Sequence, residues 1–124
     1  MSTRATYMFK GNRDIKSTSF YIHWDGYPEG AAIYFYNMLT SDFRGNLATK
    51  FIKANDAAEI TDGHDAHDDT DYCYDIYGDD ADAIITAYKI NRMLADDKIT
   101  RTKVCCMSLR EFVNTYGVKW NVRL

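Results

Sequence analysis

The sequence is poor in the residues and motifs that mark common enzyme classes. It has one proline and three cysteines, with no Cys-x-x-Cys pair, and it lacks P-loop, Gly-x-Gly-x-x-Gly and Gly-x-Ser-x-Gly motifs. Nucleotide-driven chemistry and standard serine hydrolase chemistry each depend on such a glycine-rich turn. Neither chemistry is therefore expected, and we expect no cofactor.

Long apolar segments are also missing. No stretch approaches the roughly 20 apolar residues that cross a bilayer, and the N-terminal residues 1–7 lack the apolar centre of a signal peptide. We therefore expect a cytoplasmic protein without a membrane partner. The odd cysteine count agrees with this expectation, because Cys105 and Cys106 would point to opposite faces of a strand. We interpret all three cysteines as free thiols.

The composition is that of a folded chain. Of the 124 residues, 46% are apolar and 15% are aromatic, and ten are tyrosines. A chain of this length is typical of one domain with its own core. Tyrosine combines contact area with a hydroxyl group, which suits half-buried sheet faces and binding surfaces. We therefore expect a single α+β domain over residues 1–124.

Alternating apolar residues predict two strands in the first quarter of the chain. Residues 4–10 and 17–24 both alternate, and residues 11–14 carry a turn signal between them. A hairpin is the simplest interpretation. In the second strand one face would carry Phe20, Ile22 and Trp24, and the other Tyr21 and His23.

Two helices are expected next. Pro28 suits the first helical position because its φ is preset and its missing N–H has no partner there. The helix should run from residue 28 to about 40. Its inner stripe would be Ala32, Phe35, Tyr36 and Leu39. The spacing of Phe43, Leu47 and Phe51 suggests a second helix to about residue 53, although Gly45 weakens it.

The remaining segments favour strands and a C-terminal helix. Residues 55–71 are polar and acidic, which predicts a loop. Strands are expected at 72–77, 83–90 and 100–107, with a helix as the alternative for 83–90. Ser108 and Glu111 form a capping box for a helix over about 109–116, and Gly117 follows as its stop. The order β-β-α-(α)-β-β-β-α favours an α+β fold with helices on a mainly antiparallel sheet.

The most distinctive string, residues 23–30, falls at the expected strand-to-helix corner. A structural interpretation gives Trp24, Gly26, Tyr27, Pro28 and Gly30 to the corner itself, with Trp24 as core anchor and Gly26 in an unusual conformation. A catalytic interpretation uses His23 as a base, oriented by Asp25 or Glu29. No nucleophile accompanies the corner in sequence.

The same string carries a resemblance. The motif His-x-Asp-Gly-Tyr-Pro-Glu-Gly at 23–30, preceded by Arg4, resembles small proteins of phages and mobile elements whose functions are mostly unassigned. The Tyr72-x-Tyr74 strand and the helix start at 108–112 are similar in order, so the resemblance covers most of the chain. It implies no established activity. Small phage proteins often act as counter-defence factors, such as anti-CRISPR proteins, and that role is the expectation.

A possible metal site lies in the string Asp-Gly-His-Asp-Ala-His-Asp-Asp at 62–69. His64 and His67, with aspartate neighbours, are suitable ligand types for zinc, nickel or manganese. Their spacing matches neither the helical His-Glu-x-x-His motif nor an EF-hand loop. A solvated acidic loop is therefore favoured, and no metal is assigned.

Acidic residues are concentrated in the middle of the chain. Residues 56–97 hold 13 Asp and Glu against Lys89 and Arg92, a local net charge of −11 within an overall charge of −3. Such carboxylates can imitate phosphates to a basic groove, whereas direct binding of nucleic acid is disfavoured. The partner-binding candidates are Asp65, Asp68, Asp69, Asp71, Tyr72, Tyr74, Asp75, Tyr77, Asp79 and Asp80.

Three functions follow as hypotheses. The favoured one is a non-catalytic inhibitor that docks this acidic surface on a basic groove of a host protein or ribonucleoprotein defence complex. The second is a small enzyme that uses His23 with Asp25 or Glu29. The third is a metal-binding accessory protein with His64 and His67 as ligands.

Overall fold

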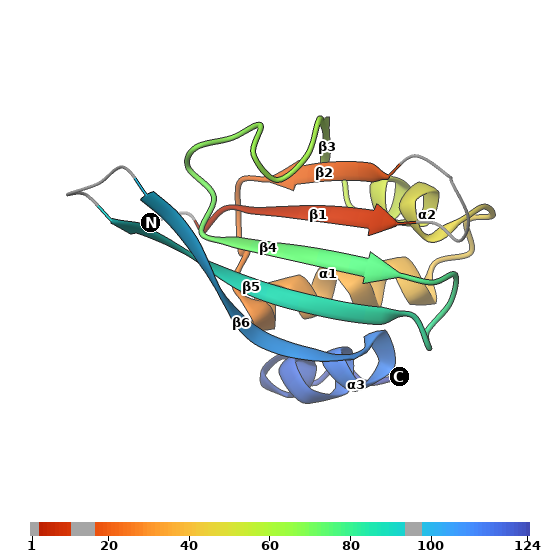
Figure 1. The fold of residues 1–124 in the computed structure, drawn as a ribbon. Coiled ribbons are helices and arrows are strands. Elements are labelled where there is room, and N and C mark those ends of the chain that lie inside the picture. The colour runs from red at the N-terminus through yellow and green to blue at the C-terminus, as the bar shows by residue number, and fades with distance from the viewer. Residues whose placement is uncertain (1–2, 11–16, 94–97) are drawn as a thin grey trace.

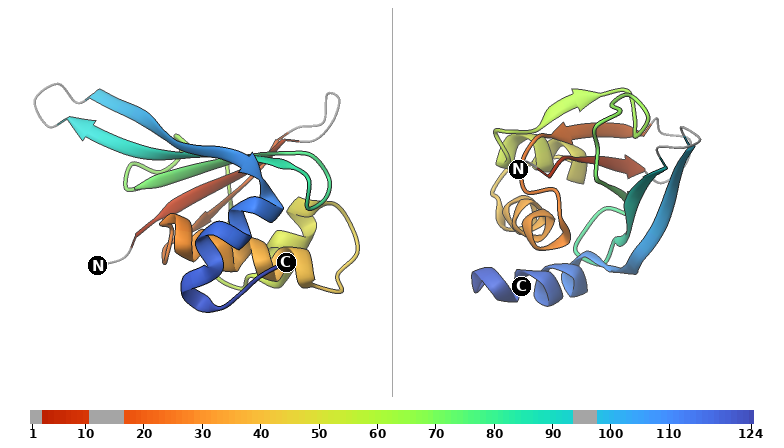
Figure 2. Two further views of the ribbon diagram at one scale, coloured as in Figure 1. Left: turned by 90° about the horizontal axis from the view of Figure 1, so that it is seen from below. Right: turned by 90° about the vertical axis from the view of Figure 1, so that its left-hand side faces the viewer.

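The computed structural model describes residues 3–10, 17–93 and 98–124, which form a six-stranded sheet with three α-helices (Figure 1). The elements are β1 (Ala5–Lys10), β2 (Thr18–Ile22), α1 (Pro28–Thr40), α2 (Leu47–Ala54), β3 (Glu59–Thr61), β4 (Tyr72–Tyr77), β5 (Ile84–Met93), β6 (Lys98–Ser108), α3 (Leu109–Tyr116) and the 3₁₀ helix η1 (Gly117–Trp120). All three α-helices lie on one side of the sheet (Figure 2). The expected α+β fold is confirmed.

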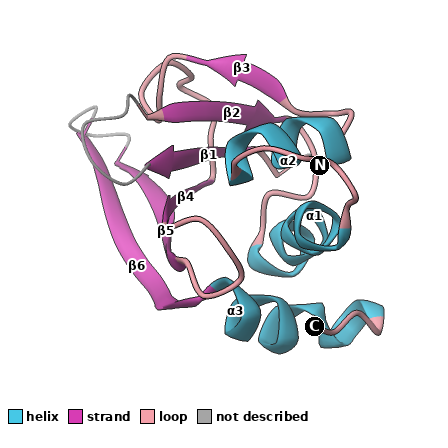
Figure 3. Ribbon diagram, turned by 90° about the vertical axis from the view of Figure 1, so that its right-hand side faces the viewer, coloured by secondary structure: helices cyan, strands magenta, loops and turns pink. Residues whose placement is uncertain are grey.

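The sheet has the strand order β3-β2-β1-β4-β5-β6. The predicted antiparallel hairpin of β1 and β2 is present, while the turn expected at 11–14 lies outside the described residues. β1 and β4 pair in parallel, and the other neighbours pair antiparallel. The parallel pair, whose strands lie side by side in Figure 3, could not be predicted from local signals. Two strands, two helices and a loop separate β1 from β4 in the chain.

The structure resolves two segments, one that the sequence left open between strand and helix and one that it predicted as a loop. The segment predicted at 83–90 as strand or helix is β5, whose Ile85 and Ala87 enter the core. The segment 55–71, predicted as loop throughout, contains the short strand β3 beside β2. β3 has one apolar residue, Ile60, and its side chain is 75% exposed. The sequence therefore has no alternating apolar pattern that could have predicted this strand.

The helices follow the sequence signals closely at their starts. Pro28 begins α1, and the Ser108 hydroxyl accepts a hydrogen bond from the Glu111 amide at the start of α3. α2 begins at Leu47 and not near residue 43, because Gly45 has a φ of +121° and Asn46 caps the helix. Phe43 therefore stays outside the helix and is 45% exposed.

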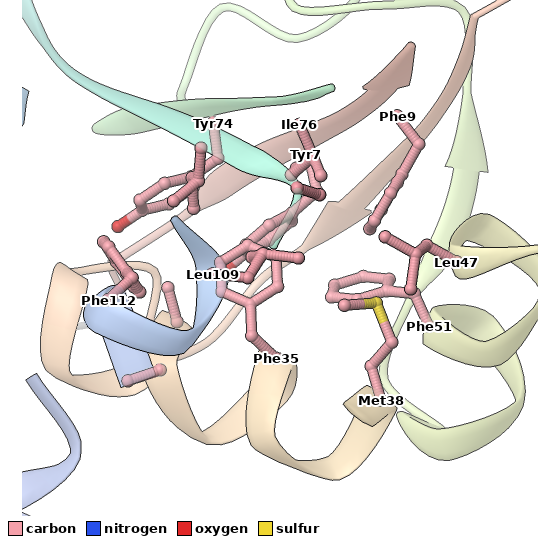
Figure 4. Packing of buried hydrophobic residues seen from close by; sticks show 14 of the residues in the cluster. Tyr7, Phe9, Phe35, Met38, Leu47, Phe51, Tyr74, Ile76, Leu109 and Phe112 are labelled. Carbon is pink, nitrogen blue, oxygen red and sulfur yellow. The ribbon is translucent and has the colours of Figure 1, made fainter. Parts of the chain in front are cut away.

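An aromatic core fills the space between the helices and the sheet (Figure 4). Tyr7 of β1 stacks on Tyr74 of β4 with ring centroids 5.0 Å apart, and Phe35 of α1 meets both rings edge-on. In the α1 stripe Ala32 and Phe35 are buried as predicted. Tyr36 and Leu39 are only partly buried. Met38, which lies between them in the sequence, is fully buried in their place.

The corner at 23–30 turns by a different route from the one expected. Trp24 is 57% exposed and is not a core anchor, because β2 ends at Ile22 and the alternation stops there. The positive φ, +53°, belongs to Asp25 and not to Gly26. A Cβ on Gly26 would lie 2.7 Å from Ala5 Cβ, and one on Gly30 would collide with the Asp25 carbonyl oxygen. Both glycines serve close backbone approach.

Candidate functional site

The face of the sheet opposite the helices is partly covered by the acidic loop, residues 62–71 (Figure 1). This loop contains five aspartates and no lysine or arginine. It joins β3 at one edge of the sheet to β4 in the middle, so it crosses the ends of β2 and β1. Beneath it, Thr6 of β1 and Cys73 of β4 are fully buried, although they point away from the helical core.

A buried histidine ties the acidic loop to the sheet. His64 Nε2–H donates to the carboxylate oxygen Oδ1 of Asp75 at 2.7 Å, and Nδ1 of the same ring shares a hydrogen bond with the Thr6 hydroxyl. Both partners come from strands, and both are buried. At the loop end, Asp71 Oδ2 accepts from the Arg4 amide at 3.0 Å. Polar contacts at His64 and at Asp71 therefore hold the loop on the sheet.

Asp75 is the ionic centre of this anchor. Lys10 Nζ lies 3.6 Å from its second oxygen. Burial by itself raises the pKa of Asp75, but the hydrogen bond from His64 and the charges of His64 and Lys10 outweigh burial. The net pKa lies below the ordinary aspartate value, so Asp75 is ionised at neutral pH.

The acidic candidates separate into three groups. Asp65 and Asp68 are exposed on the loop, and Asp65 forms a 3.4 Å ion pair with Arg101 of β6. Asp69 and Asp71 are partly engaged with the protein itself, since Asp69 accepts from the Tyr21 hydroxyl at 2.8 Å. Asp79 and Asp80 lie in the turn after β4, at the other end of that strand. The −11 segment is therefore not one continuous patch.

Two of the predicted partner-binding residues are buried in the structure. Tyr74 is fully buried in the aromatic core, and Asp75 lies under the acidic loop as its anchor. Alternation along β4 explains both, because the strand is covered on its two faces. Tyr72 is half-buried and Tyr77 is 51% exposed, with its hydroxyl accepting from Lys10 Nζ at 2.9 Å. These two tyrosines remain available to a partner only in part.

A groove of about 580 Å³ lies between the acidic loop and the open sheet face. Its lining residues are Met8, Lys10, Asp62, Gly63, His64, Asp65, Ala66, Asp75 and Arg101. The Arg101–Asp65 ion pair closes one side of it. Sequence reasoning missed Lys10 and Arg101 as residues of this groove and Thr6 as the partner of His64. Period-two alternation along β1 places Thr6, Met8 and Lys10 on one face, but nothing local links that face to the loop.

The predicted metal ligands His64 and His67 point to different partners. Both ring nitrogens of His64 are used by Thr6 and Asp75. His67 stacks on Tyr21 with centroids 3.8 Å apart, and its Nε2 shares a 3.0 Å hydrogen bond with the Thr61 hydroxyl. Among the residues that the structure describes, no group of three His, Cys, Asp or Glu could hold a metal ion.

The chain Thr6–His64–Asp75 has the residue types of a nucleophile, base and orienting acid, but its geometry does not suit catalysis. Thr6 is fully buried, so its hydroxyl cannot reach a substrate carbonyl. The thiol of Cys73 below the loop is also buried, which raises its pKa to about 11 and keeps it protonated. The buried chain is an anchor for the loop.

The catalytic arrangement predicted at the corner, with His23 as base and Asp25 or Glu29 as its partner, is not assembled as expected. His23 Nε2 lies 3.5 Å from Glu59 Oε2 of β3, and its ring meets Tyr21 edge-on. In the described part of the chain, neither Asp25 nor Glu29 pairs with His23. Asp25 Oδ1 instead accepts from the Tyr27 hydroxyl at 3.3 Å. The corner therefore brings His23 towards β3 and leaves Asp25 on the helical side.

Comparisons with protein families, with curated proteins and with solved structures found no match. No helix in the described ranges has the length and apolar character needed to span a membrane. All three cysteines are free.

Proposed function

We propose that this protein is a non-catalytic binding protein that docks its acidic loop on a basic surface of a partner. The observation that carries the proposal is the anchored loop: exposed carboxylates stand on a backbone that buried His64 fastens to Asp75 and Thr6. Because the loop is ordered before binding, less conformational entropy is lost on association. The exposed carboxylates are those of Asp62, Asp65, Asp68 and Asp69.

The chemistry of the loop favours a partner surface that normally holds nucleic acid. A run of carboxylates without interspersed lysine or arginine offers the same charge as a run of phosphates. The resemblance of the motif at 23–30 to small phage proteins adds the biological context. The proposed partner is therefore a nucleic-acid-handling host defence complex in the cytoplasm, such as a CRISPR effector.

The test separates the exposed carboxylates from those that hold the fold. Asp62, Asp65 and Asp68 are exposed and take no part in the anchor, so their combined change to asparagine should leave the fold intact. A matched control neutralises three exposed acids elsewhere: Asp42, Asp56 and Asp82. Each exposed pair contributes up to about 1 kcal/mol, so the loop variant should lose about tenfold in affinity.

Affinity capture from a host lysate with salt-graded elution supplies the partner. The captured protein is then titrated with nucleic acid in the presence of the wild-type protein and of each triple variant. We expect the wild type to displace nucleic acid, with less displacement at high salt, because salt screens exposed charge pairs. Equal displacement by the loop variant and the control variant would reject docking through the acidic loop.

A further inference from the structure

A second surface feature lies on the helical side of the corner. A cleft of about 300 Å³ opens between the start of α1 and η1, and its lining residues are Asp25, Gly30, Ile33, Tyr34 and Trp120. Two of these are aromatic, one is aliphatic and one is a carboxylate. The cleft therefore combines an apolar interior with one negative charge.

The walls of the cleft are fixed by two hydrogen bonds, one of which joins segments far apart in the chain. Trp120 Nε1–H donates to the Glu29 carbonyl at 2.9 Å, and the Tyr34 hydroxyl donates to the Trp24 carbonyl at 2.9 Å. Both side chains are thus oriented before any ligand binds. Tyr34 is also desolvated, which together with the nearby charge of Asp25 raises the pKa of Tyr34 to about 12.

Asp25 is the charged group of the cleft, and it lacks a cationic partner. Within the described residues no lysine, arginine or histidine lies at ion-pair distance from it, and its observed contact is the weak 3.3 Å hydrogen bond from Tyr27. The start of α1 carries a dipole charge of about +0.5. Lys119 beside the Trp120 ring adds a further positive charge. The carboxylates of Asp25, in the lining, and Glu29, next to it, together still leave a small net negative charge at the cleft.

We propose that this cleft receives an arginine side chain of a protein partner. A guanidinium group stacks flat on aromatic rings and pairs with a carboxylate, and its aliphatic stem packs against an apolar residue. Tyr34 and Trp120 supply the rings, Asp25 the carboxylate and Ile33 the apolar contact. Lys119 Nζ lies over the Trp120 ring, 5.1 Å from its centroid, so the arginine stacks on the other face of this ring or displaces the lysine.

This inference does not depend on the acidic loop. The cleft and the loop use different residues, and the helices and the loop lie on opposite sides of the sheet (Figure 2). It does give a role to the side chain of Asp25, the residue that holds the positive φ of the corner.

The two tryptophans make the cleft observable by itself. ¹⁵N-labelled protein has two indole N–H signals, one from Trp120 in the cleft and one from Trp24 outside its lining. A blocked Gly-Arg-Gly peptide should shift the Trp120 signal saturably at millimolar concentration, whereas the same peptide with citrulline should not. Equal shifts from both peptides, or equal shifts at Trp24, would overturn the proposal.

A matched pair of variants tests the carboxylate. Asp25→Asn keeps the shape and tolerates the positive φ, so the fold should survive. It should weaken the arginine peptide about fivefold, whereas Asp42→Asn, at another exposed position, should change nothing. Unchanged binding by Asp25→Asn would reject the site. If agmatine bound much more tightly than the peptide, a free small cation would replace a protein side chain as the ligand.

Discussion

The two faces of the sheet are covered in different ways. On one face, three helices bury a cluster of aromatic rings centred on Tyr7, Phe35 and Tyr74. On the other, a polar loop is held by the hydrogen-bonded chain Thr6–His64–Asp75. Apolar burial supplies most of the stability of a fold, whereas a buried polar chain contributes less and fixes one geometry. The difference suggests that one face holds the fold and the other positions the proposed binding surface.

The largest effect is expected from the aromatic face. Phe35→Ala removes a ring that contacts the rings of Tyr7, Phe51, Tyr74 and Phe112. Such a cavity should lower the free energy of unfolding by about 3–5 kcal/mol, measured by chemical denaturation. Phe43→Ala is the control, because Phe43 is 45% exposed and should cost under about 1 kcal/mol. Similar losses for the two variants would mean that the core is not centred on α1.

A smaller and more local effect is expected from the loop face. His64→Gln cannot span both Thr6 and Asp75, and leaving a buried polar group unpaired costs about 1–3 kcal/mol. Amide hydrogen exchange should accelerate in residues 62–71 while β1 stays protected. Asp68→Asn is the control, since Asp68 is exposed on the same loop and lies outside the anchor. Uniform acceleration throughout the sheet would show that the loop and the core form one cooperative unit.

The smallest effect concerns acid. The pKa of Asp75 is lower in the folded state than its ordinary value of 3.8, so ionised Asp75 stabilises the fold above that value. This contribution should be lost as the pH falls through the lower, folded pKa. Stability measured between pH 5 and pH 2 should therefore fall less steeply for Asp75→Asn than for the wild type. Asp68→Asn, on the exposed loop, should retain the wild-type slope, and an unchanged slope in both would contradict the anchor.

Local signals in the sequence predicted most of the elements and few of the contacts between them. Pro28, the Ser108 capping box and the alternation in β4 each act within a few residues, so they can be recognised without the fold. His64 was recognisable as a chemically capable residue, but the sequence offered it only as a weak metal-ligand candidate in a loop expected to be solvated. Its partners Thr6 and Asp75 lie 58 and 11 residues away, and only the parallel pairing of β1 with β4 brings them together.

The sequence by itself determined the α+β fold class, the starts of the helices and the excess of aspartate in the middle of the chain. Tertiary structure decided which of those aspartates face solvent. Asp75 is buried because β4 is covered on both faces, and Tyr74 beside it is buried for the same reason. It also decided that Trp24 is exposed and that Trp120 closes a cleft beside Asp25. Hydrophobic periodicity reports which residues seek burial. The partner of each buried or exposed group depends on contacts between distant segments, which no local pattern encodes.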